Sequence, residues 1–469
     1  MVKRVKRRSS SPTPANAPVT PPTLADLHNW YEFATIQGRP DGIVGNYNIR
    51  LLTAIAWGLE GCSVNIRGES GAGKTRILNA TEVIFFGDDS LNDKNPDVFT
   101  LTASSDKGQL TESKANRISS AYRAVIPELQ AAYTSRDIKE MMKRWMEDRA
   151  YQYDRYSNES ETKRLSLPPL PILTNLAEEN DELKDLGAEL NRRMFSLWVK
   201  STANINDRVQ HAKAQREFMS SSELKPLSQA QVSQLREHLL GAVKDDRRVI
   251  NPGADALRVI NPSKFTMSNS FIDFLFATTR GITKFYAYER LATEKILLAA
   301  PADNVIAEIL GGDAIRDLSI GLQSIGREIL AVIPLQGRRG DLFMSDNRES
   351  APKDSISIGG ITDALDKNFG ITYPKKNVEI LVNRLVSTNF VKYQPDAGLY
   401  FRTTDPEEEQ VMDVNQLKTE SLLNVEKRFP ELYKGYSEMR WLDYYLCPFC
   451  NKEIKIGKQC DCEYTKEEV

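Results

Sequence analysis

The sequence has few cysteines, few histidines and no long apolar run, and each shortage excludes a class of protein. No segment approaches the ~20 consecutive apolar residues of a membrane-spanning helix, so we expect no membrane partner. Four of the five cysteines lie within the last 23 residues, which is unlike a secreted disulfide scaffold and favours a reducing, cytoplasmic setting. The three separated histidines, His28, His211 and His238, argue against catalysis by a histidine base or a histidine metal centre.

The charge is nearly balanced, with 62 basic against 64 acidic residues and a net charge of -2. Any contact with nucleic acid must therefore come from local basic patches. At roughly 150 residues per domain, 469 residues predict about three compact units. Residues 1–22 begin with five basic residues in the first eight and continue with Ser, Pro and Ala, which predicts disorder. A solvated tail, a nucleic-acid-binding arm and a targeting sequence all fit this composition.

The strongest motif is a glycine-rich loop between an apolar strand (64–66) and a predicted helix. It reads GESGAGKT and fits the phosphate-binding pattern G-x-x-x-x-G-K-[S/T]. Glycines at this spacing let backbone N–H groups point into one concavity at the helix amino terminus. We expect Lys74 to hold the β- and γ-phosphates and Thr75 to bind Mg²⁺. The predicted nucleotide-binding residues of the loop are Gly68, Glu69, Ser70, Gly71, Ala72, Gly73, Lys74 and Thr75.

Two polar strand ends follow the loop. An apolar strand, Ala124 to Ile126, leads to Pro127 and Glu128, which is the candidate general base or metal-side carboxylate. Spacing leaves both roles open, together with that of an exposed glutamate. A further strand (171–173) ends in Thr174 and Asn175, and a polar side chain there can orient water or contact the γ-phosphate.

These motifs occur in the order GESGAGKT, VIPELQ, PILTN, ELNRRMF and FATTRGITKFYAYERLATEKILLAA over about residues 60 to 300. In this order the chain resembles the AAA+ ATPases that phages, plasmids and archaeal mobile elements encode as replicative helicases, often beside primases. The resemblance implies ATP as the nucleotide, Glu128 as the Walker B carboxylate and Asn175 as sensor 1. It implies Arg192 or Arg193 as the arginine finger, against a solvated helix end as the alternative. The usual Walker B Asp is absent, since Pro127 precedes Glu128.

The segment from 271 to 300 has aromatic and aliphatic residues at helical spacing, and we expect it to form a helical lid over the nucleotide. Arg280 is the nearest candidate for a nucleotide-binding lid arginine, and a structural arginine fits equally.

After a Gly, Ser and Pro-rich linker, residues 355–404 read as helix, turn, helix and two strands, which predicts a winged helix-turn-helix. The expected DNA face is Lys375, Lys376, Asn377 and Arg384 of the second helix, with Lys392 or Arg402 on the wing. Protein contacts or ring assembly are the alternative use of such a domain.

The last 23 residues contain two close cysteine pairs, Cys447-x2-Cys450 and Cys460-x-Cys462. Four thiolates in this spacing predict a tetrahedral structural Zn²⁺ site that folds a segment too short to bury its own core.

The combined prediction is an α/β protein: an AAA+ P-loop core with a helical lid, a winged helix-turn-helix and a small zinc ribbon. We expect a DNA-dependent ATP hydrolase with ATP, Mg²⁺ and Zn²⁺, a helicase or translocase of a virus or mobile element. It would act in DNA replication as a homo-oligomeric ring, a hexamer, on single-stranded or duplex DNA, with a primase or polymerase as partner. The alternatives are an initiator or loader that uses ATP as a switch and a nucleotide-regulated DNA-binding transcription regulator. The expected divisions are 1–22 (tail), 23–240 (core), 241–335 (lid), 336–354 (linker), 355–404 (winged helix), 405–440 (helical connector) and 441–469 (zinc ribbon).

Overall fold

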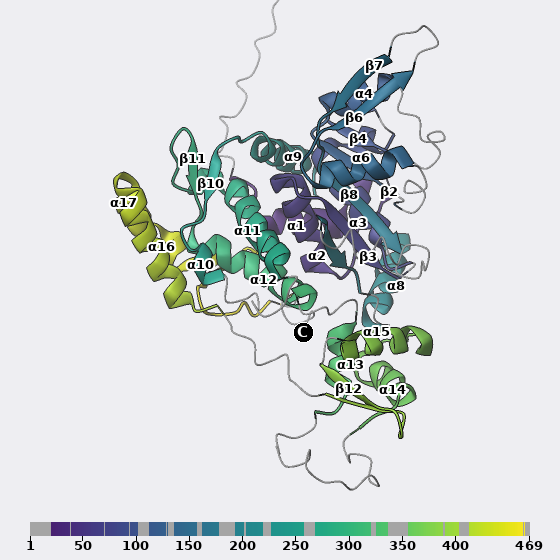
Figure 1. Cartoon of the computed structure of the whole chain (residues 1–469). Helices are drawn as coiled ribbons and strands as arrows, with labels where there is room; N and C mark the ends of the chain where they lie inside the picture. The colour runs from purple at the N-terminus through teal and green to yellow at the C-terminus, as the bar shows by residue number, and fades with distance from the viewer. Residues whose placement is uncertain are drawn as a thin grey trace, which may run out of the picture.

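A five-stranded parallel sheet with the order β4-β5-β8-β3-β9 lies at the centre of the computed structural model (Figure 1). This sheet confirms the α/β prediction. Its strands are β3 (Val64–Gly68), β4 (Val98–Thr100), β5 (Arg123–Ile126), β8 (Ile172–Ala177) and β9 (Phe195–Trp198). The structure describes residues 20–37, 39–69, 71–92, 94–101, 112–127, 129, 136–156, 162–177, 193–200, 203–218, 227–257, 268–319, 325–335, 355–387, 390–402, 412–462 and 464.

Both faces of the sheet are buried, and alternate residues of a strand enter different cores, as the two-residue period of a strand requires. Val125 and Leu173 belong to a large core that also contains the first helices, whereas Ala124 and Ile172 belong to a smaller one. The large core is covered by α1 (Leu24–Phe33), α2 (Tyr47–Thr53) with its π-helical continuation η1 (Ala54–Glu60), α3 (Lys74–Phe86) and α9 (Gln229–Val243). The smaller core is covered by α4 (Glu112–Ser120) and α6 (Arg136–Met146).

Helix α1 begins directly after Thr23, its N-cap residue. The Asp26 carboxylate in the first turn accepts from the Thr23 N–H and from the Thr23 hydroxyl, at 2.7 and 2.9 Å, which fixes the start of the helix. Two antiparallel hairpins also accompany the sheet, and the longer one stands at the upper edge of the molecule in Figure 1. The shorter hairpin is β1 (Thr35–Ile36) with β2 (Arg39–Pro40), and the longer one is β6 (Tyr151–Tyr156) with β7 (Thr162–Leu167). This part of the chain also contains η2 (Asp88–Asn92) and α8 (Ala203–Phe218).

The lid region is only partly helical, in contrast to the prediction for 271–300. Its first part is α11 (Ser268–Phe285), but β11 (Ile296–Leu298) follows and pairs in parallel with β10 (Arg248–Ile250). A strand forms there because Ile296, Leu297 and Leu298 find a backbone partner outside their own segment, which local periodicity does not reveal. The other elements of the lid region are α10 (Ala254–Leu257), η5 (Ala287–Glu289) and α12 (Pro301–Ser319). The predicted connector contains α16 (Val414–Arg428) and α17 (Pro430–Ser437).

Helices α16 and α17 pack on the lid, so the predicted connector is more than a spacer. The Tyr436 hydroxyl donates to the Ala299 carbonyl at 2.8 Å, and the Asn424 amide donates to the Pro252 carbonyl at 2.8 Å. Both side chains tie the connector to the backbone around β10 and β11.

A separate unit of three helices and a hairpin lies below the sheet in Figure 1. Helix α13, which the sequence places in the lid, shares one apolar core with the two predicted helices of this unit. Residue Ile356 exchanges two backbone hydrogen bonds with Tyr400, so a third extended segment joins the hairpin. The elements are α13 (Gly326–Val332), α14 (Ile358–Phe369), α15 (Lys375–Ser387), β12 (Val391–Gln394) and β13 (Leu399–Arg402).

The cysteine-rich end forms a small antiparallel hairpin, here called the cysteine ribbon (443–464), after η7 (Arg440–Leu442). Its strands are β14 (Tyr444–Leu446) and β15 (Glu453–Lys455). The described residues of the ribbon form no separate core, because Tyr445, Cys447 and Phe449 belong to the large core of the sheet domain. None of the helices in the described part of the chain combines the length and the apolarity that a membrane span requires.

Candidate functional site

The loop between β3 and α3 has the backbone that its glycines predict. Gly68, Gly71 and Gly73 have φ angles of +146°, +82° and +91°, which residues with a side chain rarely adopt. A Cβ atom at Gly68 would lie 2.6 Å from the carbonyl oxygen of Val199, whereas no described residue lies within 4 Å of the Cβ positions of Gly71 and Gly73. Gly68 therefore permits close packing, while the other two border the space in which a phosphate would lie.

Lys74 and Thr75 begin α3, immediately after the loop. The buried ammonium group of Lys74 donates to the Gly68 carbonyl at 2.9 Å and also to the carbonyl of Glu69. These contacts hold a positive charge against the loop backbone. Because the amino terminus of a helix adds its own partial positive charge, the local field favours an anion.

Asn175 reaches this loop from the neighbouring strand. The parallel register sets Asn175 of β8 beside Ile66 of β3, and the carboxyl ends of both strands reach the same edge of the sheet. The Asn175 amide donates to the Thr75 hydroxyl at 3.3 Å. On the other side of β8, the buried Thr174 hydroxyl donates to the Ile126 carbonyl at 2.7 Å. This hydrogen bond ties β8 to the strand that leads to Glu128.

Three of the predicted site residues, Ser70, Glu128 and Arg192, lie outside the described residues, so their roles stay predictions. Arg193 is described, and its guanidinium lies 2.6 Å from a carboxylate oxygen of Glu147, the first residue after α6. Its side chain is about a third exposed, at 30%.

Arg280 lies far from its predicted position at the nucleotide. Its guanidinium pairs with Glu60, at the end of η1, and Lys284 Nζ lies 3.2 Å from the same carboxylate. Glu60 precedes the amino end of β3, whereas the loop follows the carboxyl end of that strand. The structural alternative fits Arg280, and we omit it from the proposed nucleotide site.

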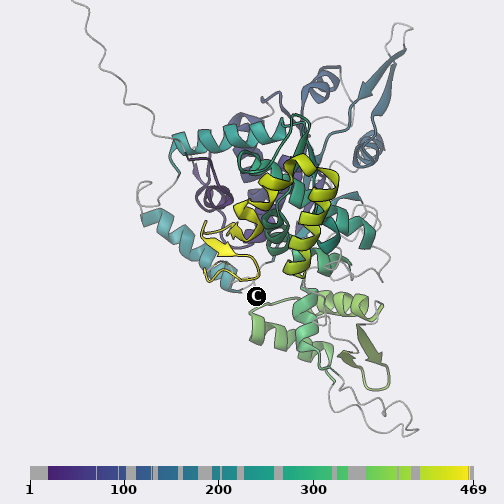
Figure 2. The ribbon, with the colours of Figure 1, turned by 90° about the vertical axis from the view of Figure 1, so that its left-hand side faces the viewer.

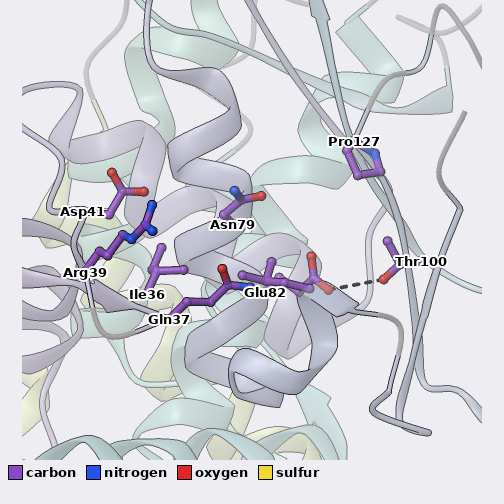
Figure 3. A pocket seen from close by; sticks show the side chains of 9 residues that line it. Ile36, Gln37, Arg39, Asp41, Asn79, Glu82, Thr100 and Pro127 are labelled. Atoms are coloured by element: carbon purple, nitrogen blue, oxygen red, sulfur yellow. Dashed lines mark hydrogen bonds between the residues drawn. The ribbon is translucent and has the colours of Figure 1, made fainter. Parts of the chain in front are cut away.

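A cavity of about 480 Å³ lies beside α3, between the β1–β2 hairpin and the ends of β4 and β5 (Figure 3). Asn79 and Glu82 project into it from α3, and the Thr100 hydroxyl donates to the buried Glu82 carboxylate at 3.3 Å. Pro127, which precedes Glu128, forms part of the wall. The described lining contains none of the loop residues, so loop geometry, and not this cavity, carries the case for a nucleotide.

Sequence reasoning missed a segment that borders the loop, residues 41–46 between β2 and α2. Asp41 pairs with Arg76 in the first turn of α3, with Nε and Oδ1 3.3 Å apart. Asn46 and Lys200 exchange two hydrogen bonds, of 3.0 and 2.9 Å, between the Asn46 side chain and the Lys200 backbone. These partners are 154 positions apart, and no local pattern links them.

The four carboxy-terminal cysteines meet as predicted. Their sulfur atoms all lie within 4.8 Å of one another, with Cys447 and Cys462 at 3.8 Å and Cys450 and Cys460 at 3.6 Å. A tetrahedron of ~2.3 Å metal–sulfur bonds has edges of about 3.8 Å, so the donor set fits Zn²⁺. The separations are well above the ~2.05 Å of a disulfide.

The predicted DNA face is a described surface of α15. Lys375, Lys376 and Arg384 are exposed, and Asn377 is half-buried. The opposite face of the helix packs into the core of its unit through Val378, Leu381, Val382 and Leu385. In the β12–β13 hairpin, Lys392 is exposed and Arg402 is half-buried.

No protein-family model and no curated protein sequence matches this chain. Among solved structures, NtrX from Brucella abortus in complex with ADP is 16% identical with a TM-score of 0.28, and the match covers 47% of this chain and 55% of NtrX. The Aeropyrum pernix ORC1 protein in complex with DNA is 12% identical with a TM-score of 0.25, covering 86% of this chain and 97% of ORC1. Likeness at this level does not establish a family, so the function rests on the residues of this chain.

Proposed function

We propose that the chain is a AAA+ ATPase that binds MgATP at the 68–75 loop and hydrolyses it while acting on DNA. The observation that carries the proposal is the loop itself. At the amino end of α3, Gly71 and Gly73 have no described neighbour within 4 Å of their Cβ positions, Lys74 donates to the Gly68 carbonyl and Asn175 donates to Thr75.

In this mechanism the loop backbone and Lys74 hold the phosphates, and Thr75 holds Mg²⁺, which would neutralise charge on the phosphate oxygens. Asn175 lies where it can orient the attacking water or a phosphate oxygen. Glu128 serves as the general base, and Arg192 or Arg193 contacts the γ-phosphate of a neighbouring copy in a ring. The four cysteines of the ribbon would hold Zn²⁺ as a non-catalytic ion, because four protein donors would leave a tetrahedral ion no position for substrate.

The proposed biological role is that of a replicative helicase or translocase, with single-stranded DNA as substrate. A replication initiator is the second candidate, because the exposed lysines on α15 favour a duplex-binding surface. Both roles require nucleotide and DNA, and they differ in which form of DNA stimulates hydrolysis.

The first test is binding of a fluorescent ATP analogue to the full chain, compared with Lys74→Ala and with Lys213→Ala, an exposed lysine on α8. We expect Lys74→Ala to weaken binding at least tenfold and Lys213→Ala to match the unmodified chain. Equal binding by all three proteins would refute the nucleotide site.

The second test is the steady-state ATPase rate without DNA, with single strands and with duplex, using Glu128→Gln as the blank. Stimulation by single strands supports a translocating motor. A slow rate that duplex alone alters supports the initiator. Binding without hydrolysis above the blank would reject the enzyme assignment.

A further inference from the structure

The cysteine ribbon packs directly against the amino-terminal helices. The Tyr464 ring lies 4.6 Å from that of His28 on α1 and 5.0 Å from that of Tyr47 on α2, both edge to face. Phe449, between the first two cysteines, lies 5.5 Å from His28. In Figure 2 the yellow strands of the ribbon lie in front of the amino-terminal part of the chain. The ribbon therefore covers aromatic side chains of α1 and α2 that would otherwise face water.

Those aromatic side chains in turn hold the 41–46 segment. Arg50 is fully buried among them, with its guanidinium 4.6 Å from the centre of the Tyr47 ring. Its Nη1 donates to the Ile43 carbonyl at 2.6 Å. Tyr47 directly follows Asn46, the last residue of the segment, and Arg50 bonds to Ile43 within it. Both partners of the Arg50–Tyr47 contact are therefore connected to residues 41–46. A change in the packing of the ribbon on Tyr47 reaches this backbone through one side chain.

The same segment holds the surroundings of the loop. Its Asp41 pairs with Arg76 in the first turn of α3, and its Asn46 is doubly bonded to Lys200. Lys200 follows Val199, whose carbonyl oxygen closes off the side of Gly68. A continuous series of contacts thus runs from the ribbon through Tyr47, Arg50 and residues 41–46 to both sides of the loop.

We propose that metal bound by the four cysteines controls nucleotide affinity through this series of contacts. The inference rests on the proposed nucleotide site. Without metal, two strands of three residues each, which lack their own core, cannot hold Phe449 and Tyr464 in place. Their loss loosens the 41–46 segment and, with it, Arg76 and Val199 at the loop. By linkage, nucleotide binding strengthens metal binding by the same factor.

The decisive variant is Tyr464→Ser, which removes the docking ring but none of the cysteines. Its matched control is Tyr444→Ser, at an exposed tyrosine on the same ribbon. Both proteins should contain one zinc per chain. We expect Tyr464→Ser to bind a fluorescent ATP analogue about 5-fold more weakly or worse, in the range typical of coupled sites. Tyr444→Ser should bind it as the unmodified chain does. Equal affinity in both variants overturns the proposal.

Two measurements on the unmodified full chain keep the test independent of any folding defect in the variant. Competition with a zinc chelator should give a zinc affinity that rises about 5-fold or more with saturating ATP, by the reciprocity of coupled sites. Amide exchange in peptides covering 41–46 should accelerate when zinc is removed. A zinc affinity independent of ATP, or unchanged exchange, overturns the coupling.

The failure of this inference is distinguishable from failure of the proposed function. If the unmodified chain binds ATP, Lys74→Ala does not, and zinc removal changes nothing, only the coupling is wrong. If the unmodified chain itself binds no nucleotide, both are wrong.

Discussion

The two ends of the central sheet differ in where their polar groups find partners. At the amino end the partners belong to the chain. The buried guanidinium of Arg123, the first residue of β5, donates to the carbonyls of Trp57, Gly58 and Tyr122 at 2.8, 2.7 and 2.9 Å. The Trp57 indole donates to the Pro171 carbonyl at 3.1 Å, just before β8.

At the carboxyl end the loop after β3 has fewer described neighbours. No described residue lies within 4 Å of a Cβ position at Gly71 or Gly73, and the hydrogen bond between Asn175 and Thr75 is long, at 3.3 Å. Backbone N–H groups in such a loop obtain strong partners when an anion binds.

We infer that residues at the amino end of the sheet stabilise the fold, whereas residues at the carboxyl end bind the nucleotide. Substitutions at the amino end should change the free energy of unfolding but not nucleotide affinity. Substitutions at the carboxyl end should change binding or hydrolysis with a small change in stability.

The largest expected effect is on stability, from Arg123→Met. Burial lowers the pKa of Arg123 to about 10, which leaves it charged at neutral pH. Its loss leaves several buried carbonyls without a donor, at about 1–3 kcal/mol for each such group. We expect the free energy of unfolding in urea to fall by about 3 kcal/mol or more, with ATP affinity unchanged where the variant is folded. The control is Arg144→Met on α6, an exposed ion pair worth about 0.5 kcal/mol or less. A large loss of ATP affinity in folded Arg123→Met would break the separation.

The next effect is on hydrolysis, from Asn175→Ala. Removing one donor aimed at a reacting oxygen typically lowers the rate about 100-fold, or roughly 2.7 kcal/mol. We expect kcat to fall by about this factor with the affinity for ATP nearly unchanged, measured by steady-state kinetics and analogue binding. Asn415→Ala, an exposed residue on α16, is the matched control. If kcat stays constant while the protein becomes less stable, Asn175 is only a packing residue.

A third effect concerns pH, through His28 beneath the ribbon. Burial, together with the nearby Arg50, lowers the pKa of His28 from 6.5 to about 3. The histidine is therefore neutral at pH 7, and its 3.7 Å contact with Glu32 is not an ion pair there. Arg50 donates to Nδ1 at 3.4 Å, which places the proton of neutral His28 on Nε2.

Because the folded pKa is depressed, the unfolded chain binds more protons between pH 6.5 and about 3. Stability is thus complete above pH 6.5 and falls as the pH decreases, at about 1.4 kcal/mol per unit. Between pH 7 and 5 the unmodified chain should lose about 2 kcal/mol more than His28→Gln in urea denaturation. His211→Gln, at an exposed histidine on α8, should keep the slope of the unmodified chain. Parallel slopes for all three proteins would contradict a neutral, buried His28.

What the sequence predicted correctly was local in the chain. The loop could be predicted from Gly68 to Thr75 alone, because its glycines permit positive φ angles and a helix follows directly. The four cysteines are also near one another in the sequence, within the last 23 residues, and thiolates at this spacing favour one shared metal ion. The apolar runs at 124–126 and 171–173 predicted strands without giving their order in the sheet.

What the sequence did not predict depends on distant packing. Arg280 has the spacing of a lid arginine, but α11 packs on η1 and turns it toward Glu60 at the opposite end of the sheet. Helix α13 precedes the predicted 336–354 linker, yet its apolar residues pack in one core with those of α14 and α15. The bonds between Asn46 and Lys200 join two loops with no pattern of their own.

The smallest expected effect compares two glycines that both face open space. Gly73 has a φ of +91°, whereas Gly241 lies within α9 and has no such angle. Alanine at Gly73 must adopt a backbone conformation unfavourable for a residue with a side chain, so Gly73→Ala should lower the free energy of unfolding by about 1 kcal/mol. Alanine at Gly241 should raise it by about 0.5–1 kcal/mol, because alanine favours a helix more than glycine does. Thermal denaturation without nucleotide should therefore shift in opposite directions. If Gly73→Ala were as stable as Gly241→Ala, the loop would not keep its left-handed backbone in solution, and the open end of the sheet would form only around a bound phosphate.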